Sequence, residues 1–314
     1  MNRFAKFCWG VLAYNIAVIL WGAYVRATGS GAGCGSHWPT CGGEIIPRPQ
    51  SVETLIEFAH RASSGLALLA VLGMFVWAFR TYPRRHTVRL GASLSLLFII
   101  TEALVGAGLV LFEWVARDTS AARALSMAVH LVNTFLLLAS LTLTAWWASG
   151  GAAVHLRGQG TVLRLLATGM VSVLVLGMSG AVIALGDTLF LGLGVSPQES
   201  PLVRTLVAIR PIHPVIAVLV GIYLSVMGFR LLDLRPHRFT ARLVIVLMML
   251  YVVQILAGGV NVVLKAPVWM QIVHLLLSDI IWVALVLLAA VSLSAVRQEQ
   301  AVVPSSSVPS PSRP

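Results

Sequence analysis

The chain has 314 residues, of which 58% are hydrophobic and only 11% are charged, and its mean hydropathy is +0.90. A soluble domain carries about 25% charged residues, so this composition excludes an ordinary water-soluble protein and indicates a chain surrounded by membrane lipid. The net charge of +11 is compatible with nucleic-acid binding, but the basic residues lie in particular connections between apolar stretches, a topological pattern that argues against that class.

Apolar stretches close to membrane thickness predict eight transmembrane helices. In chain order they cover roughly residues 8–26, 56–79, 90–112, 122–147, 162–185, 211–229, 243–263 and 270–296. Two connections are long, at 27–55 and 186–210, and the tail at 298–314 is rich in Ser and Pro, which predicts disorder.

The basic residues are unevenly divided between the two sets of connections. Fourteen of the 22 lysines and arginines lie in the N-terminus, the C-terminal tail and the connections at 80–89, 148–164 and 230–242, with only two acids. Because positively charged connections stay on the cytoplasmic side, we expect both termini in the cytoplasm and a multi-pass protein of the inner (cytoplasmic) membrane.

A weak internal repeat divides the chain. The segment EALVGAGLV from Glu102 resembles QILAGGVNV from Gln254, at matching places in the two halves. Four helices per half give both halves the same orientation in the membrane. The predicted fold is therefore all-α, with two pseudo-symmetric four-helix bundles in residues 1–150 and 151–297.

Four of the eight histidines lie inside apolar stretches, one on each even-numbered predicted helix: His60, His130, His213 and His274. A single one would be a polar contact between helices, but ionisable side chains in a membrane indicate function, and this pattern is regular in number and depth. All four lie toward the outer side. Two histidines per half can provide both axial ligands of a heme iron, whereas zinc needs a third or fourth ligand.

A carboxylate accompanies the first of these histidines. Glu57 and His60 are three residues apart and share a helix face, and Arg61 lies four residues from Glu57. Two interpretations stay open: a salt bridge between Glu57 and Arg61, or a carboxylate at a heme edge that moves protons. The matching residue of the second half is Arg210, which favours one chemically active heme and one electron-carrying heme. Glu102 and Asp279 also lie within spans, without an assigned role.

Two of the three cysteines, Cys34 and Cys41, lie in the long connection GSGAGCGSHWPTCGGEIIP. An outward connection faces an oxidising compartment, so a disulfide is favoured over a metal pair, with free thiols as the alternative. Cys8, at the start of the first predicted helix, is expected to be a small packing residue.

These motifs together resemble heme A synthase, a family of membrane enzymes that make heme A for terminal oxidases. The resemblance rests on WGAYVRATGSGAGC before the cysteine loop, the ExxHR signature at Glu57–His60–Arg61, and single histidines on the later helices. The sequence GSHWP departs from similar proteins at His37.

The resemblance implies that the two histidine pairs bind different hemes. His60 and His130 would hold the substrate heme O, His213 and His274 a permanent heme b, and Glu57 would be the catalytic carboxylate. A porphyrin methyl group would become a formyl group through successive hydroxylations. Heme O synthase would supply substrate, and oxidase assembly factors would receive heme A. The cysteine pair would stabilise the loop or take part in electron delivery.

Two alternatives remain. A di-heme b-type electron-transfer protein, for example a quinol oxidoreductase, would use the same four histidines, although its hemes usually lie at opposite sides of the membrane. A transporter with a histidine and carboxylate proton relay would need a broken helix near mid-membrane, which the sequence does not indicate.

Overall fold

The computed structural model describes residues 1–48 and 51–294, so the predicted disordered tail at 298–314 lies outside the described residues. The helices are α1 (Arg3–Ala27), α2 (Val52–Thr81), α3 (Thr87–Leu111), α4 (Ala121–Ala148), α5 (Gly160–Asp187), α6 (Pro201–Ile209), α7 (Ile212–Leu234), α8 (Arg238–Val263) and α9 (Val268–Ser294). A 3₁₀ turn (Ser30–Ala32) follows α1, and a π turn (Thr188–Gly192) extends α5. No strand occurs in this part of the chain, which confirms the all-α class.

Eight helical segments of the described chain are long and apolar enough to cross a membrane, as predicted. The short helix α6 is an addition, because its residues were expected to form part of a connection. Ser200 caps α6 by accepting a hydrogen bond from the amide of Val203, and Pro201 occupies its first turn. Val203 and Leu206 are buried, so tertiary packing stabilises a helix too short to be found as an apolar stretch.

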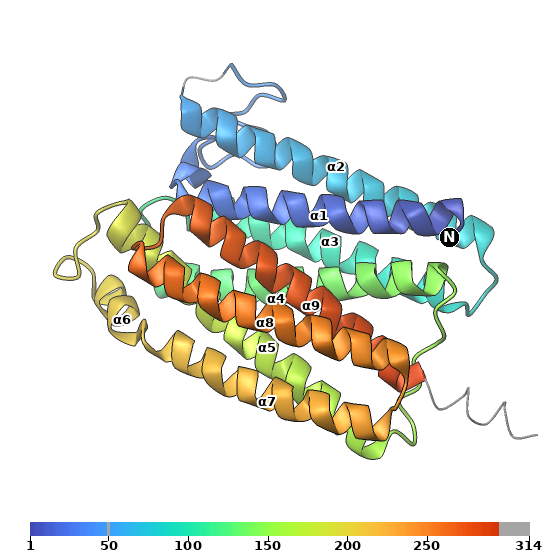
Figure 1. The fold of residues 1–314 in the computed structure, drawn as a ribbon. Helices are drawn as coiled ribbons and strands as arrows, with labels where there is room; N and C mark the ends of the chain where they lie inside the picture. The colour runs from blue at the N-terminus through green and yellow to red at the C-terminus, as the bar shows by residue number, and fades with distance from the viewer. Residues whose placement is uncertain (49–50, 295–314) are drawn as a thin grey trace, which may run out of the picture.

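The helices of each half form a closed ring of neighbours. In the first half α1 contacts α2 and α4, and α3 lies between α2 and α4; in the second, α5 contacts α7 and α9, and α8 lies between α7 and α9. Figure 1 shows α1 and α2 along one side of the molecule and α5 and α7 along the other. This arrangement is compatible with the predicted repeat, and internal symmetry between the halves stays a prediction.

The two halves share one core. Helix α4 packs on both α5 and α9, and α1 also contacts α9. Trp282 of α9 stacks on Phe135 of α4 with ring centroids 5.0 Å apart, and its indole N–H donates to the Phe135 carbonyl at 2.6 Å. Both side chains are almost completely buried, so the two halves are closely packed against each other as in a protein interior.

The two long connections meet at the same end of the bundle. Figure 1 shows the segment after α1 and helix α6 at that end, with the N-terminus at the opposite end. Gly29 adopts a left-handed conformation (φ 71°), and a Cβ there would lie 2.8 Å from Leu193 Cδ2. Only glycine therefore lets the first connection pack closely on the residues that follow the π turn.

Candidate functional site

The second half brings its two histidines together. His213 lies in the first turn of α7 and His274 in α9, and their ring centroids are 6.5 Å apart at an interplanar angle of 77°. Metal–imidazole bonds are about 2 Å long, so one metal ion bound by two opposed imidazoles separates the ring centres by roughly 6 Å. The spacing therefore fits a single metal ion held between His213 and His274.

The hydrogen bonds of His213 suit it for metal binding. The Ser179 hydroxyl donates its one proton to the Leu176 carbonyl at 2.7 Å, so it accepts from Nδ1–H of His213, which lies 2.8 Å away. This contact places the proton on Nδ1 and leaves the Nε2 lone pair free. A serine in this position acts like the outer partners that orient metal-ligating histidines.

Glycines on neighbouring helices make room for three of the four rings. A Cβ would lie 2.9 Å from the ring of His60 at Gly22, 3.0 Å from His213 at Gly180 and 3.2 Å from His274 at Gly258. These glycines were not identified from the sequence, because the close approach of two helices is not visible in it. The repeat offered a partial signal, since Gly258 in QILAGG corresponds to Gly106 in EALVGA, although a Cβ at Gly106 would meet no atom within 4 Å.

The two histidines of the first half lie on helices that both pack on α1. The His60 ring of α2 packs against Gly22 of α1, and His130 lies on α4, which also contacts α1. Nδ1 of each ring is buried and has no hydrogen-bond partner among the described residues. Buried polar atoms are normally bonded, so unmet bonding capacity is expected where a ligand completes the site.

Glu102 of α3 lies beside His130, a contact that the sequence did not reveal. Its Oε1 is 3.7 Å from Nε2 of His130, and its two oxygens accept hydrogen bonds from Asn133 and Thr134 of α4. Glu102 is thus held against the helix that carries His130, and it belongs with the first-half site.

The second half has an amide at the corresponding position of the repeat. Nε2 of Gln254 lies 3.3 Å from Nε2 of His274 and donates to Ser278 Oγ at 2.7 Å. Each half therefore places a polar side chain beside the histidine of its last helix, a carboxylate in the first half and a neutral amide in the second. Aligning Glu102 with Gln254 in the repeat was the available signal.

Both carboxylate oxygens of Glu57 accept hydrogen bonds from the protein. Glu57 is 3% exposed; its Oε1 accepts from Arg61 Nη2 at 2.5 Å and Nε at 3.1 Å, and its Oε2 accepts from the amide of Cys34 at 2.8 Å. The salt bridge between Glu57 and Arg61 is present, and the role of this carboxylate at a heme edge stays a prediction. The additional contact with Cys34 joins the carboxylate to the cysteine loop.

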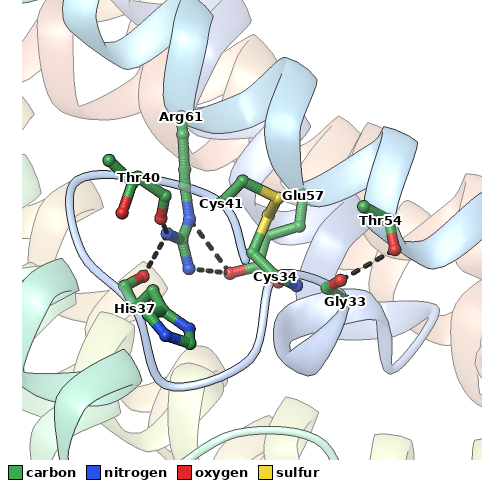
Figure 2. A network of polar contacts seen from close by, with 8 residues as sticks. All are labelled: Gly33, Cys34, His37, Thr40, Cys41, Thr54, Glu57 and Arg61. Carbon is green, nitrogen blue, oxygen red and sulfur yellow. Dashed lines mark hydrogen bonds and ion pairs between the residues drawn. A yellow bond between two sulfur atoms is a disulfide. The ribbon is translucent and has the colours of Figure 1, made fainter. Parts of the chain in front are cut away.

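The cysteine loop lies directly on α2, as Figure 2 shows. The predicted disulfide between Cys34 and Cys41 is present, with the two Cα atoms 4.5 Å apart. Arg61 donates to the carbonyls of His37 and Thr40, so His37 contributes its backbone while its side chain is exposed. The packing is close enough that a Cβ at Gly33 would lie 2.4 Å from the α2 backbone.

The remaining polar residues within the spans differ in their surroundings. Arg210, the second-half counterpart of Glu57, forms an ion pair with Asp187 of α5 at 2.7 Å. Asp279 is completely buried, and neither carboxylate oxygen has a hydrogen-bond partner in the described chain. The residue three positions before the first histidine is therefore ion-paired in both halves, as a carboxylate in the first and as an arginine in the second.

The residue types fit heme better than a free metal ion. Across residues 1–48 and 51–294 there is no group of three or more His, Cys, Asp or Glu side chains that could hold a metal ion. Zinc sites need three or four such ligands, whereas heme iron takes its equatorial ligands from the porphyrin and needs only axial ones. Paired histidines with glycines behind the rings therefore fit heme.

Comparison with known proteins identifies relatives along most of the chain. The family described as cytochrome oxidase assembly protein (COX15-CtaA) matches residues 5–286. A protein named protoheme IX farnesyltransferase from Thermus thermophilus is 56% identical over 300 residues, which cover 93% of this chain and 49% of that protein. The chain thus spans about half the length of this relative.

Proteins named heme A synthase match over shorter regions. The one from Exiguobacterium sibiricum is 38% identical over 124 residues, 40% of this chain and 39% of that protein. The one from Halalkalibacterium halodurans is 43% identical over 97 residues, 31% of this chain and 33% of that protein.

Proposed function

Because the chain belongs to the cytochrome oxidase assembly protein family (COX15-CtaA), we propose that it is a heme A synthase, an oxidoreductase that converts heme O to heme A for terminal oxidases. The observation that carries the proposal is the pair of histidine sites, of which the second has the spacing for one bis-histidine iron. Its relatives named heme A synthase support the assignment.

The two sites have different roles in this proposal. His60 and His130 bind the substrate heme O, and His213 and His274 bind a permanent heme b. The polar surroundings support this division, since the first site has carboxylates at Glu57 and Glu102 while the second has Arg210 and Gln254 at the corresponding positions. Carboxylates can hold and release protons, which an oxidation at carbon requires.

The overall conversion replaces two methyl hydrogens by one oxygen atom. With water as the oxygen source, four protons and four electrons are released, and the electrons must pass to an external acceptor. By two successive hydroxylations with dioxygen, two O2 molecules, four protons and four electrons from an external donor are consumed, and three water molecules are released, one of them from the gem-diol. The bound heme supplies the redox chemistry. The chain positions the porphyrin through His60 and His130, and Glu57 and Glu102 are the groups that can accept protons beside it.

The Cys34 amide and Arg61 hold Glu57 in a fixed orientation beside His60, one helical turn away. A carboxylate whose position is set by its neighbours loses little freedom when substrate binds, so this arrangement favours accurate placement at the porphyrin edge. The disulfide maintains the loop that supplies the Cys34 amide. Participation in electron delivery is the alternative role for this cysteine pair.

We also propose that the substrate comes directly from a heme O synthase. The Thermus relative is about twice as long as this chain and is named protoheme IX farnesyltransferase, an activity that makes heme O. The unmatched half of that protein would carry the transferase, and the matched half would consume its product. Oxidase assembly factors would then receive heme A. Membrane lipid surrounds the chain, which we place in the inner membrane with cytoplasmic termini and an outward cysteine loop.

Extraction and chromatography of the bound hemes tests the function. Protein purified from cells that also express a heme O synthase should contain heme b together with heme O or heme A. His60→Ala should lose heme O and heme A but retain heme b, and His274→Ala should lose heme b. Heme b alone in the wild type would favour the di-heme electron carrier, and absence of a Soret band would contradict every heme assignment.

A further inference from the structure

Arg26 connects the two halves of the molecule. It lies in the last turn of α1, within the WGAYVRATGSG segment, and its guanidinium reaches across to the second half. Nη1 donates to the Ala184 carbonyl at 2.7 Å and to Thr188 Oγ1 at 2.6 Å, and Nη2 donates to Gln271 Oε1 at 3.0 Å. One side chain of the first half thus binds two separate elements of the second.

The groups bound by Arg26 lie next to the second histidine pair. Ala184 is one turn beyond Gly180, the α5 residue against which the His213 ring packs, and Gln271 is three residues before His274 on α9. The guanidinium therefore ties the helix behind one axial ligand to the helix that carries the other.

The acceptors are themselves held in place. Thr188 Oγ1 donates to the Ala184 carbonyl at 2.9 Å, and the Gln271 amide donates to the Ala266 carbonyl at 2.7 Å. All three acceptors of Arg26 are neutral, so the arrangement depends on the direction of several N–H donors and not on an ion pair. A planar guanidinium provides such a fork, whereas a lysine ammonium is a point charge on a flexible chain.

We propose that Arg26 is a positioning residue for the second-half heme: it sets the separation of α5 and α9 and thereby the 6.5 Å spacing of His213 and His274. The proposal rests on the assignment of heme b to this pair. It also means that the first half, which holds the cysteine loop and the substrate site, controls the geometry of the electron-carrying site.

The test measures heme b at the second site alone. In a His60→Ala background, which removes the first-half site, Arg26→Gln should accelerate loss of heme b to a heme-scavenging protein at least tenfold and alter the low-spin ferric EPR signal. Arg26→Lys should restore only part of the wild-type retention. The matched control is Arg123→Gln, because Arg123 is a buried arginine whose side chain donates only to first-half carbonyls, those of Ala116 and Asp118.

Unchanged heme retention and EPR signal in Arg26→Gln would overturn the proposal, as would equal losses in Arg26→Gln and Arg123→Gln. Should Arg26→Gln not fold, Gln271→Ala removes the α9 acceptor alone and should accelerate heme loss in the same direction; unchanged retention there would also overturn it. The parent His60→Ala protein distinguishes failure of the heme b assignment from failure of the role of Arg26. Absence of heme b in this parent refutes the heme assignment itself. Normal heme b in the parent, with unchanged retention in the Arg26 and Gln271 variants, refutes only the role of Arg26.

Discussion

The amide of Cys34 donates a hydrogen bond of 2.8 Å to Oε2 of Glu57, which joins one end of a disulfide to the helix that carries His60. The other oxygen of the same carboxylate is held by Arg61, and Arg61 in turn binds the carbonyls of His37 and Thr40 within the disulfide loop. The loop and the helix turn that carries His60 therefore form one hydrogen-bonded unit. A substitution in the loop should alter the geometry of the first histidine site, and the reverse should also hold.

Replacement of Glu57 should separate heme binding from heme conversion. Glu57→Gln keeps the side-chain shape and one acceptor but removes the proton-accepting carboxylate, so we expect heme O to remain bound while heme A output falls by roughly 10²-fold or more. Chromatography of extracted hemes measures both quantities. Glu53→Gln, an exposed change in the first turn of the same helix, should leave heme A output unchanged; normal output from Glu57→Gln would refute the catalytic assignment.

Loss of the disulfide should weaken the same unit. Cys34→Ser and Cys41→Ser should each loosen the loop that orients Glu57 and lower heme A output, with the heme b content retained because the second histidine pair lies elsewhere. Mass mapping without reductant should find Cys34 linked to Cys41 in the wild type and Cys8 free. Full heme A output from both variants would show that the bond is dispensable for conversion.

Adjacent glycines provide a direct test of the second heme site. Gly258→Ala places a methyl group 3.2 Å from the His274 ring, whereas Gly259→Ala points into open space. Displacing a packed ring costs roughly 1–3 kcal/mol, so Gly258→Ala should weaken heme b binding about fivefold or more. Both changes raise helix propensity equally. Heme titration of the apoprotein compares them, and equal affinities would contradict the observed ring packing.

Substitutions at the two corresponding polar residues, Glu102 and Gln254, should each affect only the site of their own half. Glu102→Gln removes the carboxylate beside His130, and we expect heme A output to fall while heme b content is unchanged. Gln254→Glu introduces a carboxylate beside His274 and should lower the reduction potential of heme b, since negative charge stabilises ferric iron. Spectroelectrochemical titration measures this shift. An unchanged potential would mean that Gln254 lies too far from the heme to affect it.

Sequence alone determined the features that depend on local composition. Eight apolar stretches, the histidines inside four of them and the cysteines in one connection are properties of short segments, and the free energy of placing each segment in lipid or water depends mainly on its own residues. For the same reason, the spacing of Glu57 and Arg61 was enough to suggest their salt bridge, because residues four apart on a helix are neighbours.

Tertiary structure decided the contacts between segments distant in the chain. The amide of Cys34 meets Glu57, Glu102 meets His130, and Gly22, Gly180 and Gly258 admit histidine rings from other helices. Helix α6, too short to be recognised by hydropathy, is stabilised by buried Val203 and Leu206. These features depend on the rotation of each helix and on differences of a few tenths of an ångström in the distance between helices. Both are set by close packing of the whole interior and not by the residues of any one helix.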